Sequence, residues 1–433
     1  MKKLLLLSLL SPFGLFAQPV KELILKETAN SQSAYAQWYQ WLHAHPELSR
    51  EEKNTAAYLK KEVKEMGYTV TDSLGLQSFA AVLQNGKGPI ILYRTDMDGL
   101  PVKEETGLSF ASQAQGEKDG QPVSVMHACG HDIHMSTWLG IARLMARLRK
   151  HWSGTLILLA QSAEEIGQGA RAILASPAFQ RLPRADWQLA IHDHAGLPAG
   201  QAGFCDGYAM ASVDMMNITI YGKGGHGAAP QQTIDPVLLS AQYITAIQSI
   251  VSRNLSSNDP AVITVGAVNG GTAGNIIPDK VELKLTIRSF SPETRQFIFS
   301  RLKTIGNNLA EAAGLPAEKW PDYNLLDMSI KPVYNDPALG EKLRTVLSRE
   351  ISDSSYTLVK PVMIGEDFGE YSQTPEKIPS YILWIGTVAP EKKGSAELPS
   401  LHTSRFAPDY SRTLPVAIRS VSTCLVQLFH SKR

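Results

Sequence analysis

Residues 126–134 of the chain (Met-His-Ala-Cys-Gly-His-Asp-Ile-His) gather one thiol, three imidazoles and a carboxylate within nine positions. Thiolate and imidazole are the ligands that zinc and its first-row neighbours prefer in proteins. Cys129 and His131 lie two residues apart on an expected short loop, so both can reach one metal centre. The alternative is a surface loop that is rich in histidine by chance, because short Cys/His spacings are common. The choice depends on what else the chain brings to this loop.

Four apolar runs, each typical of a buried strand, are followed by Asp, Glu or His side chains. The runs and the residues that follow them are 89–94 with Asp96 and Asp98, 155–160 with Glu164 and Glu165, 187–191 with His192 and His194, and 380–385 with His402. Nearly continuous apolar runs suit strands that are buried on both faces of a largely parallel sheet. In open α/β sheets, ligands bind beyond the carboxyl ends of the strands. The four strand ends therefore predict one shared site.

The number of candidate ligands indicates the chemistry of this site. They are Cys129, His131, Glu164 or Glu165, His192 and His402. Five ligands exceed the needs of one tetrahedral ion and suit two metals that share a bridging water, as in hydrolytic two-metal sites. Adjacent residues in extended backbone point to opposite sides, so one of the two glutamates is expected to bind metal while the other faces substrate. A carboxylate facing substrate can serve as base for the water and then as acid for the departing amine.

Composition excludes some classes of function. The chain has 433 residues and a formal net charge of +1, and it has no basic patch that would indicate binding to nucleic acid or to an anionic membrane. Lys2 and Lys3 precede an apolar run at 4–10, and a small-residue site follows near Ala17. This layout is typical of a cleaved secretory signal and is too short to span a bilayer. We therefore expect residues 1–17 to direct export, so that the mature protein is periplasmic or secreted.

The segment before the first expected strand reads as helical. Apolar residues at helical spacing cover residues 23–42. Ser49, with Glu52 three residues later, has the form of a capping box, which predicts that the next helix begins there and ends near Gly67.

The pattern of expected strands and helices changes near residue 212. In order, the region reads as a strand (214–221), a helix opened by Asp235 and Pro236, strands at 261–268 and 281–289, and a helix opened by Ser291 and Pro292. The order β-α-β-β-α-β predicts a small ferredoxin-like α+β unit at 212–330. It would be inserted into a larger domain formed by residues 18–211 and 331–433. We expect that domain to be α/β, with a mixed, mostly parallel sheet flanked by helices.

Several motifs together resemble one family over the span from His45 to Thr403. The motifs are Asp-Met-Asp-Gly-Leu-Pro at 96–101, His-Ala-Cys-Gly-His-Asp at 127–132, Ala-Glu-Glu at 163–165, Gly-Gly-His at 224–226, Asn-Ile-Ile-Pro-Asp at 275–279 and Gly-Glu-Asp-Phe at 365–368. They resemble those of the metal-dependent amidohydrolases that include hippurate hydrolases, N-acyl-amino-acid hydrolases and plant indole-acetyl-amino-acid hydrolases. That group is related to aminoacylase and to carboxypeptidase-like peptidases.

The resemblance implies specific metal ligands. Carried over position by position, they are Cys129, His131, Glu165, His192 and His402. His194 competes with His192 for one of these roles, and the match through residues 196–198 favours His192. The implied cofactors are two divalent metal ions, zinc or manganese, with cobalt or nickel as further possibilities. Glu164 becomes the general base that later protonates the leaving amine.

The resemblance also implies roles for residues of the inserted unit, which would act as a dimerisation or lid domain. His226 corresponds to a histidine that reaches the site of a partner subunit in a homodimer and stabilises the tetrahedral oxyanion. Asn275 and Arg288 correspond to groups that hold the substrate carbonyl or carboxylate, and the planar fork of arginine suits a carboxylate. Gly99, where the family usually has Ala, and Gln231-Gln232, where it usually has a His, are departures that can alter the pocket.

The expected function is hydrolysis of the amide bond of N-acyl-amino acids, hippurate-like or related acyl conjugates, by a dinuclear metal site. The expected partner is therefore a small molecule, with no nucleic acid and no membrane after signal cleavage. A dipeptidase or carboxypeptidase on the same scaffold is the nearest alternative. A cysteine hydrolase, with Cys129 as nucleophile and His131 as base, is a third reading. The fourth is a non-catalytic binding protein that keeps the fold.

Overall fold

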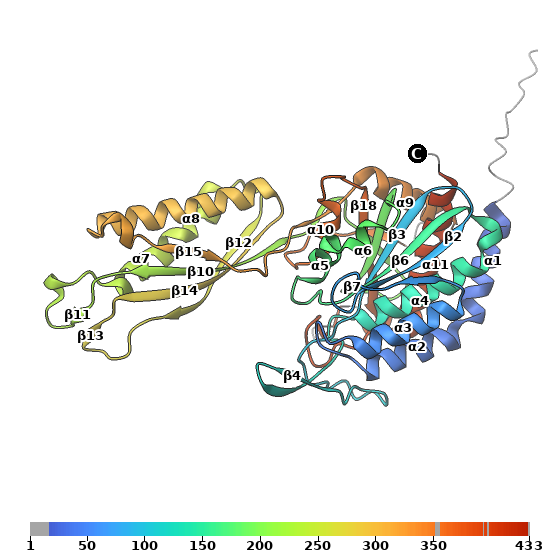
Figure 1. Cartoon of the computed structure of the whole chain (residues 1–433), viewed down its shortest axis with the longest axis horizontal. Helices are drawn as coiled ribbons and strands as arrows, with labels where there is room; N and C mark the ends of the chain where they lie inside the picture. Colours follow the sequence, from blue (N-terminus) through green and yellow to red (C-terminus); the bar gives the residue numbers. More distant parts are fainter. Residues whose placement is uncertain (1–16, 351–355, 393, 396–397, 432–433) are drawn as a thin grey trace, which may run out of the picture.

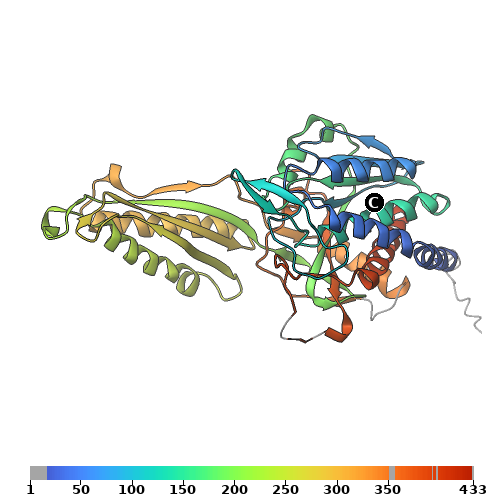
Figure 2. The ribbon, with the colours of Figure 1, turned by 90° about the horizontal axis from the view of Figure 1, so that it is seen from below.

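The computed structural model describes residues 17–350, 356–392, 394–395 and 398–431. The expected signal sequence falls, except for Ala17, outside these residues. The described part of the chain forms two lobes, a larger one around a central sheet and an elongated smaller one (Figure 1). Figure 2, turned by 90°, also separates them. Within the described ranges, no helix combines the length and apolar character that crossing a membrane requires.

The larger lobe is organised around an eight-stranded sheet. In spatial order the strands are β1 (Thr69–Thr71), β2 (Phe79–Asn85), β6 (Gly154–Gln161), β3 (Ile90–Asp96), β7 (Trp187–Pro198), β18 (Ser380–Val388), β8 (Ala202–Phe204) and β17 (Tyr356–Leu358). The four central strands β6, β3, β7 and β18 run parallel, whereas β1, β2 and the β18–β8 pair are antiparallel. The expected mixed, mostly parallel α/β sheet is confirmed, and the central strands carry the apolar runs because both of their faces are buried.

Helices cover the two faces of this sheet unequally. The residues of one face share a core with α1 (Ala17–Asn30), α2 (Gln32–Ala44), α3 (Lys53–Glu65), α4 (His131–Arg147), α9 (Pro337–Glu350) and α11 (Tyr410–His430). The other face packs on three short helices, α5 (Gly169–Ala175), α6 (Pro177–Gln180) and α10 (Gly369–Ser372). Successive residues of β18 alternate between the two cores, as the pleat of a strand requires.

Two expectations for the N-terminal helices are wrong. The helical stretch expected at 23–42 is two helices, because α1 ends at Asn30 and α2 begins at Gln32. Glu52 does cap α3, but its side chain makes no capping hydrogen bond. Instead it accepts hydrogen bonds from Ser162 Oγ (2.6 Å) and from Ala163 N (2.8 Å). The Ser49 hydroxyl donates to Asp98 Oδ2 (2.6 Å). Both side chains thus support the loops that follow β3 and β6.

The smaller lobe is an antiparallel sheet with two helices. The sheet has the spatial order β12 (Ala261–Asn269), β14 (Lys280–Ser289), β10 (Ser212–Tyr221) and β15 (Asp322–Leu325). Helices α7 (Pro236–Ser249) and α8 (Pro292–Ala312) share its core, and their first turns are capped by the side chains of Asp235 and Ser291. The chain order is the β-α-β-β-α-β of a ferredoxin-like unit. The pair β11 (Gly225–His226) and β13 (Ile276–Ile277) lies at the far end of this lobe (Figure 1).

The remaining strands form two short antiparallel pairs. They are β4 (Gln115–Lys118) with β5 (Gln121–Ser124), and β9 (Gly207–Met210) with β16 (Val333–Asn335). The chain enters and leaves the smaller lobe side by side, since Val213 and Ile330 form an antiparallel bridge.

Candidate metal centre

The five expected metal ligands meet at the carboxyl ends of the central strands. Their atoms fall into overlapping groups, Cys129 with His131 and His192, Cys129 with Glu165 and His402, and His131 with Glu164 and Glu165. Cys129 Sγ lies 3.1 Å from His402 Nε2 and 3.8 Å from His192 Nε2. Metal bonds of about 2.0–2.3 Å at tetrahedral angles separate ligand atoms by about 3.3–3.8 Å. The Cys129–His192 distance falls in this range and the Cys129–His402 distance is slightly shorter, so small side-chain shifts would bring both pairs to coordination spacing.

Glycine is required where the Cys/His loop enters α4. Gly130 has φ 78°, and a Cβ at this position would lie 2.0 Å from Asp193 Oδ2. No other residue satisfies both conditions. The tight turn holds Cys129 and His131 on the same side of the start of the helix.

The loop that carries His402 is tied to the same place. The His402 amide donates to the carbonyl oxygen of Ala128 (2.8 Å), directly beside Cys129. His402 has the positive φ of 64°, which turns its ring towards the cluster, and His402 Nε2 lies 3.6 Å from Glu165 Oε2. A histidine that is 273 residues from Cys129 along the chain is thus fixed at the mouth of the site.

Backbone carbonyls orient the two buried histidines. His131 Nδ1 lies 2.8 Å from Asp98 O, and His192 Nδ1 lies 2.9 Å from Asp193 O. A carbonyl oxygen only accepts, so Nδ1 carries the proton and the lone pair of Nε2 is available to a metal. His194 instead accepts a hydrogen bond at Nδ1 from Gly196 N (3.0 Å). Among the described residues it belongs to none of the potential metal-holding groups.

The electrostatics of the cluster favour a cation. Burial, with further repulsion from Glu366, raises the pKa of Glu164 well above its usual range. Burial also raises the pKa of Glu165 to about 8 and that of the Cys129 thiol well above its usual range. Burial lowers the pKa of His192, which keeps its ring neutral. Against burial, Asp96 raises the pKa of His131 well above its usual range, so a bound cation would have to displace a proton from this ring. The anionic ligands that are costly to ionise and the neutral ring of His192 are what a divalent cation would stabilise.

Two buried atoms of the candidate ligands also make no hydrogen bond within the described part of the chain. They are His131 Nε2 and Glu165 Oε1, which lie 3.8 Å apart. Buried polar atoms are almost always paired, so this gap, together with the donor types, fits a bound metal.

The two glutamates do not lie in extended backbone. Residues 164–167 form a turn that begins at Ala163, whose φ is 58°, so the alternation expected for Glu164 and Glu165 is wrong. Their environments nevertheless differ. Glu165 faces both His131 and His402, whereas Glu164 Oε2 approaches only His131 Nε2 among these ligands, at 3.9 Å.

A cleft of ≈ 530 Å³ opens from the cluster towards the smaller lobe. Glu164, Glu165, His192 and His402 line one side, and Arg288 from β14 lines another. In the described ranges Arg288 makes no hydrogen bond or ion pair, so its guanidinium is available to a ligand. The remaining lining is mostly apolar: Val213, Met215, Met328, Ile330, Met363, Ile364 and Leu401.

Two expected site residues do not reach this cleft in the same chain. His226 and Asn275 lie together at the far end of the smaller lobe, where Gly227 N donates to Asn275 O (2.9 Å) (Figure 1). Both side chains are exposed. His226 Nδ1 accepts from Ala228 N (3.0 Å), so the neutral ring carries its proton on Nε2 and can donate from there.

Sequence reasoning missed a buried ionic network beside the glutamates. Arg94 pairs with Asp96 (2.6 Å), Glu366 (2.9 Å) and Asp367 (2.9 Å), and all four side chains are fully buried. The available signal was an arginine within the apolar run that forms β3. The methionines of the cleft were also missed, because they come from three distant segments.

Comparisons with known proteins agree with this site. Residues 92–410 match the model of Peptidase family M20/M25/M40. The N-acetylcysteine deacetylase of Bacillus subtilis is 35% identical over 81% of this chain and 87% of its own length. The N-acetyldiaminopimelate deacetylase of Leuconostoc citreum is 34% identical over 86% and 92%.

A solved structure extends the likeness to the whole fold. The YXEP protein of Bacillus subtilis, described as a dinuclear metal binding peptidase from the M20 family, superposes with a TM-score of 0.77 at 28% identity, covering 93% of this chain and 100% of that one. The family match spans well over half of the chain and includes all five clustered ligands. The chain therefore belongs to Peptidase family M20/M25/M40 and is a metal-dependent amidohydrolase.

Proposed function

We propose that this protein hydrolyses the amide bond of N-acyl-amino acids at a pair of divalent cations. The observation that carries the proposal is the convergence of five candidate metal ligands, four of which line one cleft together with Glu164 and with Arg288, whose side chain has no partner among the described residues. The names of the relatives support the reaction class, since both deacetylases act on an N-acetyl group of an amino acid.

Cys129, His131, Glu165, His192 and His402 would hold the cations. Bound cations would polarise the scissile carbonyl and lower the pKa of water at the site. Thiolate and imidazole donors favour zinc, while manganese, cobalt or nickel can load according to availability.

Glu164 is the residue of the cluster that remains for proton transfer. Its carboxylate lines the cleft beside the ligands, and only Glu165 of the pair joins the group with Cys129 and His402. In the proposed reaction Glu164 accepts a proton from the attacking water and delivers it to the leaving nitrogen.

Arg288 and the apolar lining would recognise the two halves of the substrate. The guanidinium suits the carboxylate of the amino acid, because it can make two parallel hydrogen bonds. The aliphatic and methionine side chains of the cleft suit an apolar acyl group, and flexible methionines adapt to more than one shape. Hippurate-like conjugates fit this division.

We also propose a homodimer that completes the site. His226 and Asn275 lie away from the cleft of their own chain, on the exposed end of the smaller lobe. A second copy could present both, with His226 Nε2–H donating to the developing oxyanion. Mixing inactive His226→Ala and Glu164→Gln subunits should restore activity if the site is shared, and no recovery would argue against it.

Export remains a prediction from the first 17 residues. N-terminal sequencing of the mature protein should start near residue 18, whereas a mature chain that begins at Met1 would contradict it.

A dipeptidase or carboxypeptidase activity is the alternative, supported by the peptidase names of the family and of the YXEP structure. A dipeptide differs from an N-acyl-amino acid in its free ammonium group.

Metal analysis joined to a hydrolysis screen, with acyl-amino acids and dipeptides as substrates, separates the two functions. We expect N-acyl-amino acids to be cleaved, activity to be lost on chelation, and alkylation of thiols to have no effect on the metal-loaded protein. Preference for dipeptides would favour the alternative, and activity without metal would overturn the proposal.

A further inference from the structure

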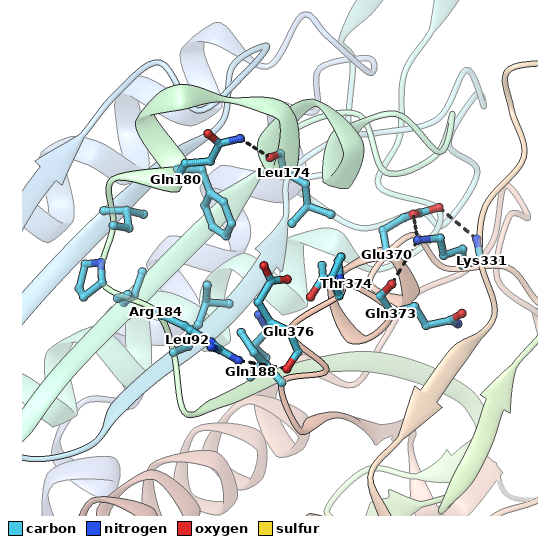
Figure 3. Close-up of a pocket in the computed structure, with 17 residues that line it drawn as sticks. Leu92, Leu174, Gln180, Arg184, Gln188, Lys331, Glu370, Gln373, Thr374 and Glu376 are labelled. Carbon is cyan, nitrogen blue, oxygen red and sulfur yellow. Dashed lines mark hydrogen bonds and ion pairs between the residues drawn. The ribbon is translucent and has the colours of Figure 1, made fainter.

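A second large hollow lies in the larger lobe, apart from the metal cleft. It is a cavity of ≈ 600 Å³, here called the back cavity, on the sheet face that carries α5, α6 and α10 (Figure 3). Its floor is formed by one side chain from each of three adjacent strands, Leu92 of β3, Ile157 of β6 and Gln188 of β7. No ligand of the metal cluster lines it.

The back cavity exists because this face of the sheet is thinly covered. Its helices have seven, four and four residues, and they leave an opening above the centre of the sheet. The walls are two segments: Leu174 to Ala185 on one side and Glu370 to Ile378 on the other. Leu174, Phe179 and Leu182 make the first wall apolar. A hollow of this size with mostly apolar walls is typical of small-molecule sites.

The side-chain amide of Gln188 lies on the floor of the cavity. Gln188 is 3% exposed, and its Oε1 accepts from Ser380 Oγ (2.9 Å). In the part of the chain that the structure describes, no acceptor pairs with Gln188 Nε2. Gln188 lines the cavity, so its Nε2–H is free to donate to water or to a bound molecule there.

Arg184 places a cation next to this amide. Arg184 Nη2 donates to the backbone oxygen of Glu376 (3.0 Å), and among the described residues no carboxylate lies within ion-pair distance of Arg184. Arg184, Gln188 and Glu376 lie together at one end of the cavity, away from Lys331 and Glu370 (Figure 3). At that other end Glu370 already pairs with Lys331 and Arg171, so its charge is balanced.

We propose that the back cavity binds small apolar carboxylic acids. The apolar body would lie over Leu92 and Ile157, and the carboxylate would accept from Gln188 and Arg184. The carboxylate of Glu376 stands at the same end and opposes an anion, but it is fully exposed and screened by solvent. Arg184 is exposed as well, so solvent screens both charges, and the amide of Gln188 adds a neutral donor on the side of the anion.

The proposal does not depend on the proposed function, although the two would be related. Acids of this class are what hydrolysis of an acyl conjugate releases. Lys331 lines the back cavity, while its neighbour Ile330 lines the metal cleft, so the two sites meet at the connection between the lobes.

The test is calorimetric titration of octanoate into the metal-loaded, full-length chain. We expect saturable binding at one site, weakened about tenfold in Arg184→Ala, because a hydrogen bond to a charged group is lost. Arg181→Ala is the matched control, since this exposed arginine of the same loop does not line the cavity, and it should bind as the unmodified chain does. Glu376→Gln should tighten binding, and octanamide, which lacks the charge, should bind more weakly than octanoate.

A second variant tests the location without touching a polar group. Leu174→Trp fills the cavity and should abolish binding, with circular dichroism to confirm folding. The carboxylate of octanoate could also bind at the metal centre. His402→Ala, which removes a candidate metal ligand, is therefore titrated in parallel and should still bind octanoate. Absence of saturable binding, equal affinity for octanamide, insensitivity to Arg184→Ala, or loss of binding in His402→Ala would overturn the proposal. Each of these results is independent of whether the protein hydrolyses N-acyl-amino acids.

Discussion

Two buried acidic clusters lie side by side at the end of the central strands, and they are neutralised in different ways. In the network around Arg94, three carboxylates surround one guanidinium, and Gln161 donates to Asp367 (2.6 Å). In the metal-ligand cluster, a thiol and two glutamates converge with no lysine or arginine at hydrogen-bond distance among the described residues, and two candidate ligand atoms make no hydrogen bond there. The first cluster contains its own cation. The second has no arginine or lysine of its own at that distance, so we expect a cation from outside to balance its thiol and carboxylates.

The largest expected effect is on catalysis at the second cluster. Glu164→Gln should lower kcat by about 10²–10⁴-fold, because the amide cannot accept a proton. Metal content should remain unchanged, since the five ligands are intact. Glu376→Gln, at an exposed position away from the metal centre, is the control for loss of a carboxylate. Steady-state kinetics and metal analysis provide the check, and a loss of less than tenfold would remove Glu164 from its role.

The next effect is on the stability of the first cluster. Arg94→Met should lower the free energy of unfolding by about 3–5 kcal/mol, because it leaves buried carboxylates without their cation. Arg171→Met removes a half-exposed partner of Glu370 and should cost less than about 1 kcal/mol. Urea denaturation measures both. Equal losses of unfolding free energy in the two variants would mean that burial does not strengthen the contribution of the Arg94 network to stability.

Removing the external cation should have a somewhat smaller effect on stability. At a free metal concentration one hundred times its Kd, binding stabilises the fold by about 2.7 kcal/mol. Chelation should therefore lower the Tm of the protein, and Cys129→Ser, which removes a ligand from two of the groups, should make the Tm less sensitive to chelator. A Tm that chelation leaves unchanged would indicate that the cluster needs no cation.

The smallest expected effect is on the free energy of unfolding that His43 contributes through its two carboxylate partners, and this effect depends on pH. His43 lies 2.7 Å from Asp132 and 2.9 Å from Glu104, and although burial opposes its charge, these carboxylates raise the pKa of His43 to about 10. The raised pKa means that the folded state holds the proton more tightly than the unfolded state. The stabilisation is complete below pH 6.5 and is lost as the pH rises through about 10.

The difference in unfolding free energy between the unmodified chain and His43→Gln should therefore shrink by about 2 kcal/mol between pH 8 and pH 10. Denaturation at several pH values measures it. A difference that does not depend on pH would show that His43 is neutral in the fold.

The sequence predicted which residues meet at the candidate metal centre better than it predicted which side chains hold their loops in place. The strand ends could be recognised because apolar runs and the ligands after them are local patterns, and the position of Gly130 follows from the same short motif. Ser49 and Glu52 were misread as a capping box, because their partners Asp98 and Ser162 lie far away in the chain. A local signature carries no information on such tertiary partners.

Other features depend on assembly of the whole chain. Arg94 is a charged residue within an apolar strand. Its charge is balanced by Glu366 and Asp367, which lie more than 270 residues later in the chain. The cleft joins Met215, Met328 and Met363 across two lobes, which no spacing rule predicts. The limits of the domains, at 211/212 and 330/331, remain sequence predictions, although the paired entry and exit strands are consistent with them.

The central claim, that cations at the five-ligand cluster carry amide hydrolysis, is tested most directly by stoichiometric metal titration. Chelated protein receives zinc or manganese in increments while cleavage of an N-acyl-amino acid and bound metal are measured together. We expect activity to appear with metal, to reach its plateau at two ions per chain, and to be absent at every metal level in Cys129→Ser. Full activity in metal-free protein, or a plateau unaffected by loss of the Cys129 thiol, would contradict it.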